Sequence, residues 1–236
     1  MLLIKSRMFK NLLKFSALFV LALSLTACGD STSTSDSNKP TKPTVVLVFG
    51  DSISQGYGTS IVGIQYQQVT PGQTYAELLR ARIQSENLAE FATINVINAS
   101  LGSEYTEEAI YRLPSLLAAF KPTHVLLAHG TNDAGSDLPN SYISGNLSTM
   151  ISMVKNSGAK PLLADVTFTR YGSDFAAAYS QMIVNTANVT GATYVALLKG
   201  VVGNPSYYLS DGVHLNDAAQ PIMMNNVWEK LIPLFD

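Results

Sequence analysis

VVLVFGDSIS, residues 45–54, is the stretch of sequence that decides the fold. Five apolar residues run without interruption from Val45 to Phe49, as in strands that are buried on both faces of a parallel sheet. The run passes directly into Gly50 and Asp51, a small-residue turn after which a helix can begin at Ser52. The stretch therefore predicts a buried strand, a tight turn and the start of a helix.

Similar apolar runs recur along the chain and alternate with longer amphipathic segments. Strands are predicted at Val45–Phe49, Ile94–Ile97, His124–Ala128, Pro161–Val166 and Thr193–Leu198, and helices at about residues 73–84, 105–119, 141–156, 174–187 and 216–234. Gly158 and Gly191 follow two of the helical segments, and Asn216 is placed to cap the last one. The alternation predicts one domain, residues 44–236, a three-layer α/β/α sandwich with a parallel five-stranded sheet.

The first 27 residues have the order of a secretory signal rather than of a packed element. Four lysine and arginine residues precede an apolar run from Phe15 to Leu25. A transmembrane helix is the alternative, but the run is well short of the ~20 apolar residues that a spanning helix needs. We therefore expect residues 1–27 to be a signal peptide, with translation starting at Met1 or at Met8.

The leader ends in Leu25-Thr26-Ala27-Cys28, which resembles a bacterial lipobox. In that motif the cysteine receives a diacylglyceryl group and the leader is cut just before it. Alternatively, Cys28 is incidental and a peptidase cuts near the small residues around it, and the domain is exported in either case. Gly29 rather than aspartate follows, which in Gram-negative lipoproteins implies transfer to the outer membrane. We therefore expect a lipoprotein on the periplasmic face of that membrane.

Residues 28–43 are expected to form a flexible tether, because nothing aliphatic or aromatic follows Cys28 in them. Loss of the leader removes four positive charges and takes the formal net charge from -2 to about -6. A nucleic-acid partner is not expected, since phosphate binding needs a basic surface. Cys28 is the only cysteine, so an intrachain disulfide is excluded. The expected partners are a membrane, through the anchor, and a small-molecule or lipid ester, with the domain acting as a monomer.

The candidate residues for chemistry follow predicted strands, where the active sites of open α/β sheets gather. Ser52 follows the first strand, and Asp211 and His214 lie three residues apart before the last helix. Asp211 can hold His214 in the tautomer whose other nitrogen takes a proton from Ser52. Taken singly, each pattern is also explained as a turn or a helix cap. Taken together, they are the residue types that a serine nucleophile needs.

Two further strand ends carry residues suited to stabilising negative charge. Asn132, within Gly130–Asp133, can donate a side-chain hydrogen bond to an oxyanion. The loop Asn98–Ser103 contains small residues that let a backbone N–H approach a ligand closely. Backbone N–H groups at a helix that begins near Ser52 would face the same charge. Each segment is also explained as an ordinary loop between a strand and a helix.

In their order, spacing and placement at strand ends, these elements resemble the SGNH subset of the GDSL hydrolases. The resemblance covers essentially the whole domain and is nearest to bacterial exported thioesterase I, lysophospholipase and arylesterase-type enzymes, including Arg112-Leu113-Pro114 and Ala219-Gln220-Pro221. It implies a flavodoxin-like fold, with Ser52 as nucleophile, His214 as base and Asp211 as the residue that orients the base.

The resemblance also implies an oxyanion hole with donors from Ser52 and Asn132. The third donor is ambiguous, because the family's glycine usually falls five residues after Asn98. This chain has Ser103 at that position and a glycine, Gly102, one position earlier. We therefore expect either Gly102 or Ser103 to supply the third donor, and Ser103 can do so if its backbone conformation does not require glycine.

The expected function is that of a serine esterase. Ser52 would attack a carboxylic ester or thioester carbonyl, His214 would take and return the proton, and water would hydrolyse the acyl-enzyme without a metal or organic cofactor. Arylesterase, acyl thioesterase or lysophospholipase activity is expected. A carbohydrate O-acetylesterase and a non-catalytic binding lipoprotein remain alternatives, although a binding protein would not need Asp211 and His214.

Other catalytic motifs are missing from the sequence. It contains no G-x-S-x-G elbow, no HExxH and no P-loop. His124 and His129 lie in or at the end of an apolar strand and are interpreted as hydrogen-bonded structural histidines, so a zinc site is not expected. Gln55–Gly72 is either a loop that overhangs the site and helps to choose the substrate, or an uninvolved surface loop.

Overall fold

A computed structural model of the protein describes residues 43–56, 69, 72–86, 93–167, 170 and 172–235. The predicted signal peptide, Cys28 and residues 29–42 of the predicted tether lie outside this part of the chain, as does most of the Gln55–Gly72 segment. Within the described ranges, no helix has the length and apolarity needed to cross a membrane.

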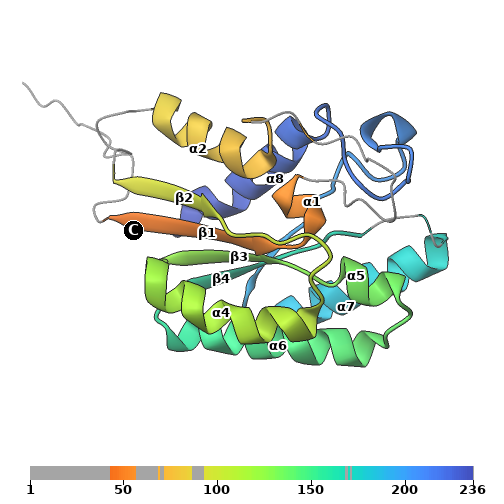
Figure 1. The fold of residues 1–236 in the computed structure, drawn as a ribbon, viewed down its shortest axis with the longest axis horizontal. Coiled ribbons are helices and arrows are strands. Elements are labelled where there is room, and N and C mark those ends of the chain that lie inside the picture. The colour runs from red at the N-terminus through yellow and green to blue at the C-terminus, as the bar shows by residue number, and fades with distance from the viewer. Residues whose placement is uncertain are drawn as a thin grey trace, which may run out of the picture. The chain divides into compact units, whose positions relative to one another are not determined.

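Five parallel strands form one sheet in the order β2-β1-β3-β4-β5 (Figure 1). The strands are β1 (Thr44–Gly50), β2 (Ile94–Asn98), β3 (His124–Ala128), β4 (Lys160–Ala164) and β5 (Thr193–Val195). This is the strand order of the flavodoxin-like doubly wound fold, so the predicted fold class is confirmed. The order reverses between β1 and β3, and this switch point is where such sheets bind ligands.

Helices cover both faces of the sheet, as Figure 1 shows. The long helices are α2 (Tyr75–Glu86), α4 (Thr106–Phe120), α6 (Asn140–Asn156), α7 (Ser173–Thr190) and α8 (Gln220–Leu231). On one face α2 packs against α8, and on the other α6 lies between α4 and α7. Two 3₁₀ turns, η1 (Pro205–Tyr207) and η2 (Ile232–Leu234), complete the C-terminal region.

The core lies between these layers and explains why the strands have apolar sequences. All five residues of β3 are buried, and so are Val46–Phe49 of β1, because helices cover the two central strands from both sides. Burial of each such side chain stabilises the fold by about 1.5–3 kcal/mol relative to an exposed one. Phe49, at the end of β1, is fully buried directly beneath the loops that carry the candidate site.

Two predicted boundaries are wrong. The apolar run after Thr193 predicts a strand to Leu198, but β5 ends at Val195 and the chain turns, with the Leu197 N–H bonded to the Val195 carbonyl at 2.9 Å. Leu197 and Leu198 are nevertheless buried, because apolar residues can fill the core from a turn. Apolarity therefore identified burial here, but not extended backbone.

The last helix begins later than the sequence predicts. Asn216 does not cap it: its side chain accepts the Ala218 N–H at 3.0 Å and so closes a separate turn, after which α8 starts at Gln220. Proline at the second helical position, Pro221, fits this start, since the first N–H groups of a helix have no partner within it. Gly158 and Gly191 follow α6 and α7 as predicted.

Candidate active site

Ser52 is the first residue of α1 (Ser52–Gln55), a short helix that begins directly after β1. The Asp51 side chain starts this helix by accepting the Ile53 N–H at 3.0 Å. Gly50 has no room for a side chain, because a Cβ atom there would lie 2.5 Å from the Ser54 Oγ and 2.8 Å from the Ala128 carbonyl. The tight turn therefore places Ser52 at the carboxyl edge of the sheet, where it is 7% exposed.

His214 and Asp211 complete a hydrogen-bonded series with Ser52. The His214 Nε2 lies 2.8 Å from the Ser52 Oγ, and the His214 Nδ1 lies 2.7 Å from the Asp211 Oδ2. Ser52 and His214 are 162 residues apart in sequence, so only the fold brings them together. The structure thus brings together the three residues that the sequence predicts as a triad.

Asp211 is anchored by the backbone of its own loop. Its Oδ1 accepts the Val213 N–H at 2.8 Å and the His214 N–H at 2.9 Å, which leaves Oδ2 aimed at the imidazole. Burial by itself raises the pKa of Asp211, but the bonds from the imidazole and the two backbone N–H groups outweigh it and hold the pKa below its usual value. The carboxylate is therefore ionised at neutral pH and favours a proton on Nδ1, with Nε2 left as an acceptor for the Ser52 proton.

Asn132 lies on α5 (Thr131–Gly135), which directly follows the loop after β3. The Thr131 hydroxyl donates to the Asp51 carboxylate, so the residues next to Asn132 and Ser52 are bonded to each other. Asp51 is fully buried, and burial raises its pKa above the usual value. One N–H of the Asn132 amide donates to the Glu104 carbonyl at 3.0 Å. The amide group has a second N–H, which is a candidate oxyanion donor.

The two candidates for the third donor differ in backbone conformation. The Gly102 N–H donates to the Gln55 side chain at 2.6 Å, and Gly102 does not have a positive φ. Ser103 has φ 64°, in the left-handed region that favours glycine. Ser103 therefore has the conformation in which a glycine would be expected, whereas the glycine beside it does not.

The loop after β2 is fastened to α1 at several points. The Asn98 side chain donates to the Ser54 carbonyl at 2.8 Å, and the Leu101 N–H donates to the Gly50 carbonyl at 2.9 Å. Together with the Gly102–Gln55 bond, these contacts hold the loop beside the turn that carries Ser52. The three strand ends that the sequence singled out thus meet at the β1/β3 switch point.

The other two histidines are hydrogen-bonded, as predicted. His124 lies near Thr123 Oγ1 and the Leu234 carbonyl, at 2.9 and 3.2 Å, at the opposite end of the sheet from Ser52. His129 is fully buried, with its Nε2 2.8 Å from the carboxylate of Glu104. Among the residues described, no three His, Cys, Asp or Glu side chains are grouped so as to hold a metal ion.

Sequence reasoning missed Glu104 and Arg112 as parts of the site region. Glu104 is 4% exposed and its carboxylate receives two N–H groups of the Arg112 guanidinium as well as His129. A local sequence pattern does not reveal this contact, because its members lie far apart along the chain. Glu104 lies in the loop after β2, Arg112 on α4 and His129 at the end of β3. A buried charge of this kind becomes recognisable only when its partners are placed in space.

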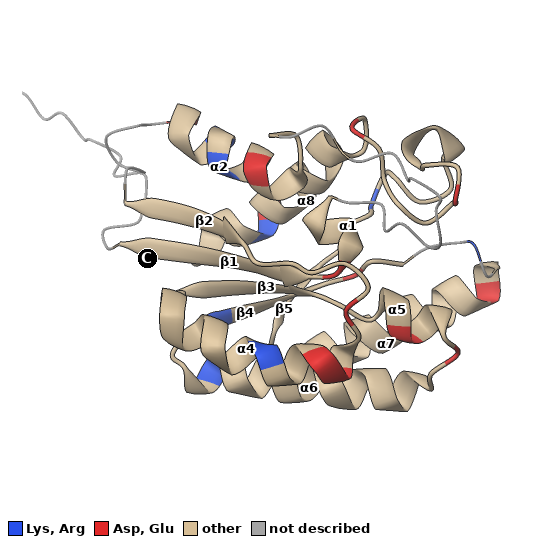
Figure 2. Ribbon diagram, in the orientation of Figure 1, with Lys and Arg blue, Asp and Glu red and all other residues tan. Residues whose placement is uncertain are grey.

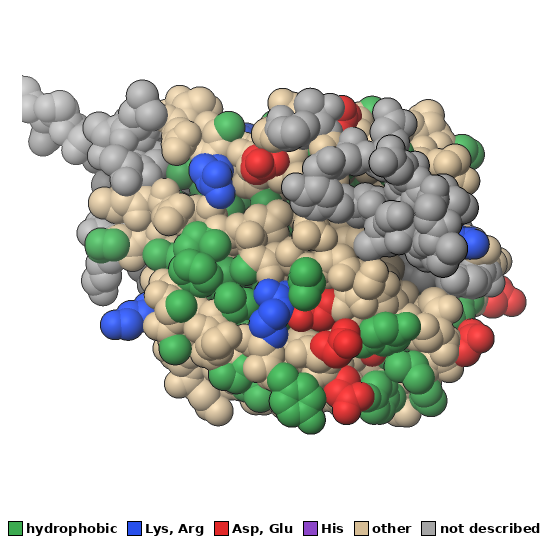
Figure 3. Space-filling view, viewed as in Figure 1, with side chains coloured by type: hydrophobic (Ala, Val, Ile, Leu, Met, Phe, Trp, Pro, Cys, Tyr) green, Lys and Arg blue, Asp and Glu red, His purple; other side chains and the backbone are tan. Residues whose placement is uncertain are grey.

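Charged side chains are unevenly distributed around the site. Figure 2 shows acidic residues around the ends of β1 and β3 and on α5, whereas lysine and arginine lie mainly along the helices and strands away from that end. On the face shown in Figure 3, acidic side chains again gather near α5 while basic ones are scattered.

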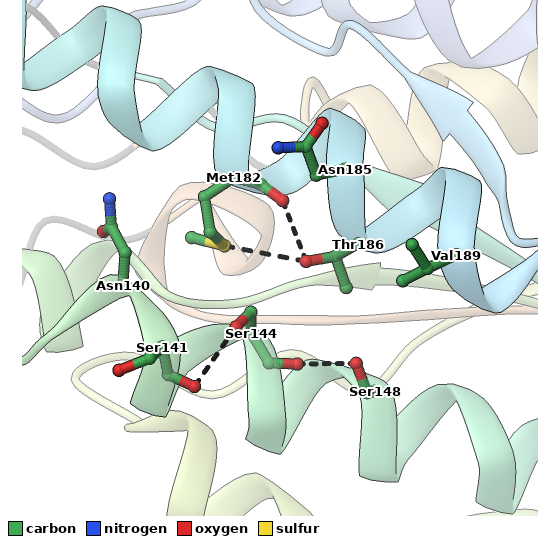
Figure 4. Close-up of a pocket in the computed structure, with 8 residues that line it drawn as sticks. All are labelled: Asn140, Ser141, Ser144, Ser148, Met182, Asn185, Thr186 and Val189. Atoms are coloured by element: carbon green, nitrogen blue, oxygen red, sulfur yellow. Dashed lines mark hydrogen bonds between the residues drawn. The ribbon is translucent and has the colours of Figure 1, made fainter.

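Two hollows that are lined by described residues lie in different parts of the molecule. One, of about 270 Å³, lies against the loop that carries Asp211 and includes Arg170, whose guanidinium donates to the Asp211 carbonyl at 3.2 Å. The other, of about 300 Å³, lies between α6 and α7 and is lined mainly by hydroxyl and amide side chains (Figure 4). No triad residue lines either hollow, but Ser210 and Gly212, which flank Asp211, line the first one.

A serine hydroxyl bonded to a histidine, which is bonded in turn to an aspartate, is the arrangement that serine hydrolases share across unrelated folds, and this chain is of that class. Residues 48–221 match the GDSL-like lipase/acylhydrolase family, and the chain belongs to this family. It is therefore an enzyme that hydrolyses ester bonds.

Relatives cover most of the chain. Esterase TesA of Pseudomonas aeruginosa is 31% identical over 191 residues, which is 80% of this chain and 88% of that protein. Thioesterase 1/protease 1/lysophospholipase L1 of Escherichia coli K12 is 26% identical over 191 residues, 80% of this chain and 84% of that protein. The crystal structure of TesA covers 80% of this chain and 99% of its own, with a TM-score of 0.69. The family match over residues 48–221 includes Ser52, Asn132, Asp211 and His214.

Proposed function

We propose that this protein hydrolyses carboxylic esters and thioesters of acyl chains through a covalent intermediate on Ser52. The observation that carries the proposal is the unbroken series from Ser52 through His214 to Asp211, with bonds of 2.8 and 2.7 Å. His214 takes the serine proton as Oγ bonds to the carbonyl carbon, and Asp211 stabilises the imidazolium that forms. His214 then protonates the leaving group, and water attacks the acyl-enzyme with His214 again as base.

The negative charge on the carbonyl oxygen is stabilised by a preorganised oxyanion hole. Its donors are the side-chain amide of Asn132 and the backbone N–H groups of Ser52 and Ser103. Ser103 is preferred over Gly102, because the Gly102 N–H is bonded to Gln55 and Ser103 has the left-handed φ. Such donors lower the barrier because they are aligned before charge develops.

Acyl chains are the preferred substrate class, with arylesterase, thioesterase and lysophospholipase activities as its forms. The names of the relatives support this choice, since esterase, thioesterase and lysophospholipase all act on acyl groups. The hollow of about 270 Å³ beside the Asp211 loop offers room for part of such a substrate. No charged cofactor or metal enters the scheme, because proton transfer by His214 and the oxyanion donors suffice for the chemistry.

The test is hydrolysis of p-nitrophenyl esters from acetate to palmitate by the purified protein. Ser52→Ala should abolish turnover, and a fluorophosphonate should modify Ser52 alone. Ser54→Ala is the matched control: Ser54 lies on the same helix, but its hydroxyl is bonded to Tyr75 rather than to His214, so turnover should persist. Activity that survives in Ser52→Ala would refute the mechanism, and activity restricted to acetate would replace acyl-chain hydrolysis by deacetylation.

We further propose that the enzyme is an exported, monomeric lipoprotein anchored through Cys28. The charge-then-apolar order of residues 1–27 and the segment Leu25–Cys28 support this assignment. Gly29 supports the periplasmic face of the outer membrane as the destination. Expression with labelled palmitate should label the wild-type chain but not Cys28→Ser, and gradient separation should place the label in outer-membrane fractions. Equal labelling of both chains would refute the anchor.

A further inference from the structure

We propose that Glu104, Arg112 and His129 form a buried positioning cluster that sets the geometry of the oxyanion hole. The inference rests on the proposed function, since it assigns a role to groups that act through Asn132 and Ser103. None of the three side chains needs to touch the substrate. Their role is to fix two separate loops relative to each other.

The carboxylate of Glu104 is the centre of the cluster. The Arg112 Nε lies 2.5 Å from Oε1, Arg112 Nη2 bonds Oε2, and the His129 Nε2 lies 2.8 Å from Oε2. The Glu104 side chain is 3% exposed and that of His129 is fully buried. Burial alone raises the pKa of Glu104, but the bonds from Arg112 and His129 outweigh it and keep the pKa below its usual value. The cluster is thus an ion pair with a third partner, in which Glu104 and His129 are buried and the Arg112 side chain is 26% exposed.

The first link to the oxyanion hole runs through the backbone of the loop after β2. Glu104 immediately follows Ser103, and its own carbonyl accepts the Asn132 amide at 3.0 Å. The Arg112 Nη1 donates to the Ala99 carbonyl at 2.7 Å. Arg112 on α4 therefore holds this loop near both of its ends, with the left-handed Ser103 between them.

The second link runs through the loop after β3. His129 lies three residues before Asn132, and its ring packs on Phe49 with centroids 4.6 Å apart. The Arg112 guanidinium lies 4.5 Å from the centre of the same Phe49 ring. Phe49 at the end of β1 thus contacts both the His129 ring and the Arg112 guanidinium, and the segments that carry Asn132 and Ser103 meet on one carboxylate.

Fold stability alone does not account for this cluster. Well-packed apolar residues of similar volume commonly stabilise a buried site as well as an ion pair does. Hydrogen bonds, unlike apolar contacts, also fix direction, and an oxyanion donor displaced by about 1 Å can cost on the order of 100-fold in rate. A cluster that aims the Asn132 amide and Ser103 backbone is therefore expected to affect the transition state rather than substrate binding.

Arg112→Lys is the test, because lysine keeps the charge but cannot form the forked contact. We expect kcat to fall about 10- to 100-fold with KM within about twofold, a smaller loss than removal of a whole oxyanion donor. Arg80→Lys is the matched control: Arg80 on α2 donates twice to the Val96 carbonyl, at 3.0 and 2.6 Å, but contacts neither oxyanion loop. It should leave kcat unchanged even if it lowers the melting temperature.

A double-mutant cycle with Asn132→Ala separates positioning from a general loss of structure. If Arg112 acts through Asn132, Arg112→Lys should lower kcat much less in the Asn132→Ala background than in the wild type. Multiplicative losses, or a rise in KM with kcat preserved, overturn the inference. Glu104→Gln removes the same contact from the other side and replaces Arg112→Lys if that variant does not fold. Absence of Ser52-dependent hydrolysis in the wild type refutes the proposed function and this inference together, whereas the cycle refutes the inference alone.

Discussion

Replacement of Asp211 by asparagine should disable the enzyme without disturbing its shape. The Asp211 Oδ1 accepts two backbone N–H groups, from Val213 and His214, and an asparagine must keep its carbonyl oxygen there to satisfy them. Its NH₂ group then replaces Oδ2, 2.7 Å from the His214 Nδ1. Two N–H groups cannot face each other, so the imidazole must carry its proton on Nε2 instead. In that tautomer Nε2 cannot accept the Ser52 proton.

The size of this effect follows from the loss of the base. A wrong tautomer in a serine triad lowers kcat by about 10⁴-fold, or about 5.4 kcal/mol in the barrier. The assay is kcat for a p-nitrophenyl ester, with circular dichroism to establish that Asp211→Asn is folded. Asp217→Asn is the control, since it removes the same charge from an exposed position on the same loop and should leave kcat unchanged. A loss below tenfold in a folded Asp211→Asn protein would refute the assigned tautomer and the role of Asp211.

Three further predictions concern the oxyanion loops. Asn132→Ala should lower kcat by about 10²- to 10³-fold with little change in KM, because the donor acts on charge that exists only in the transition state. A near-normal rate in steady-state assays would remove Asn132 from the site. Ser103→Gly should retain activity, since the donor is a backbone N–H. It should also raise the free energy of unfolding, measured in urea, by roughly 0.5–1 kcal/mol, because serine is strained in the left-handed conformation of residue 103. A lower stability would argue against the strain. Since the pKa of Glu104 is lowered by folding, its contribution to stability is present above its usual value of 4.5 and is lost as the pH falls through the lowered value. Urea titrations at pH 7 and pH 3 should therefore show a larger acid loss in the wild type than in Glu104→Gln, and equal losses would contradict the shift.

The sequence predicts the sheet well because its strands are buried on both faces. Continuous apolar runs such as Val45–Phe49 can hardly be accommodated elsewhere, and all five strands lie where these runs occur. Prediction fails where a residue is buried, or is of a capping type, without belonging to the strand or helix that its type suggests. Leu197 and Leu198 are buried although they lie in a turn. The Asn216 side chain accepts an N–H group within a turn that precedes α8 and does not cap the helix itself. In both cases the tertiary contacts choose between local structures of similar free energy.

The sequence suggests the triad residues but not the residues that surround them. Ser52, Asp211 and His214 are common turn and cap types when taken singly, but together they are the types that a serine nucleophile needs. Glu104 and Arg112 depend instead on three elements that meet only in the folded chain. The choice between Gly102 and Ser103 likewise needed a backbone angle, since residue type pointed to the glycine and conformation pointed to the serine.

The separation of Ser52 from His214 by 162 residues has a consequence for the enzyme during its synthesis. The nucleophile is made early, with the first strand, whereas its base emerges only after the other four strands and shortly before α8. A nascent or truncated chain that ends before residue 214 carries the serine but has nothing to take its proton. Hydrolytic activity therefore cannot begin until His214 has been made and has folded against Ser52, so a chain fragment that lacks residue 214 is not a working esterase.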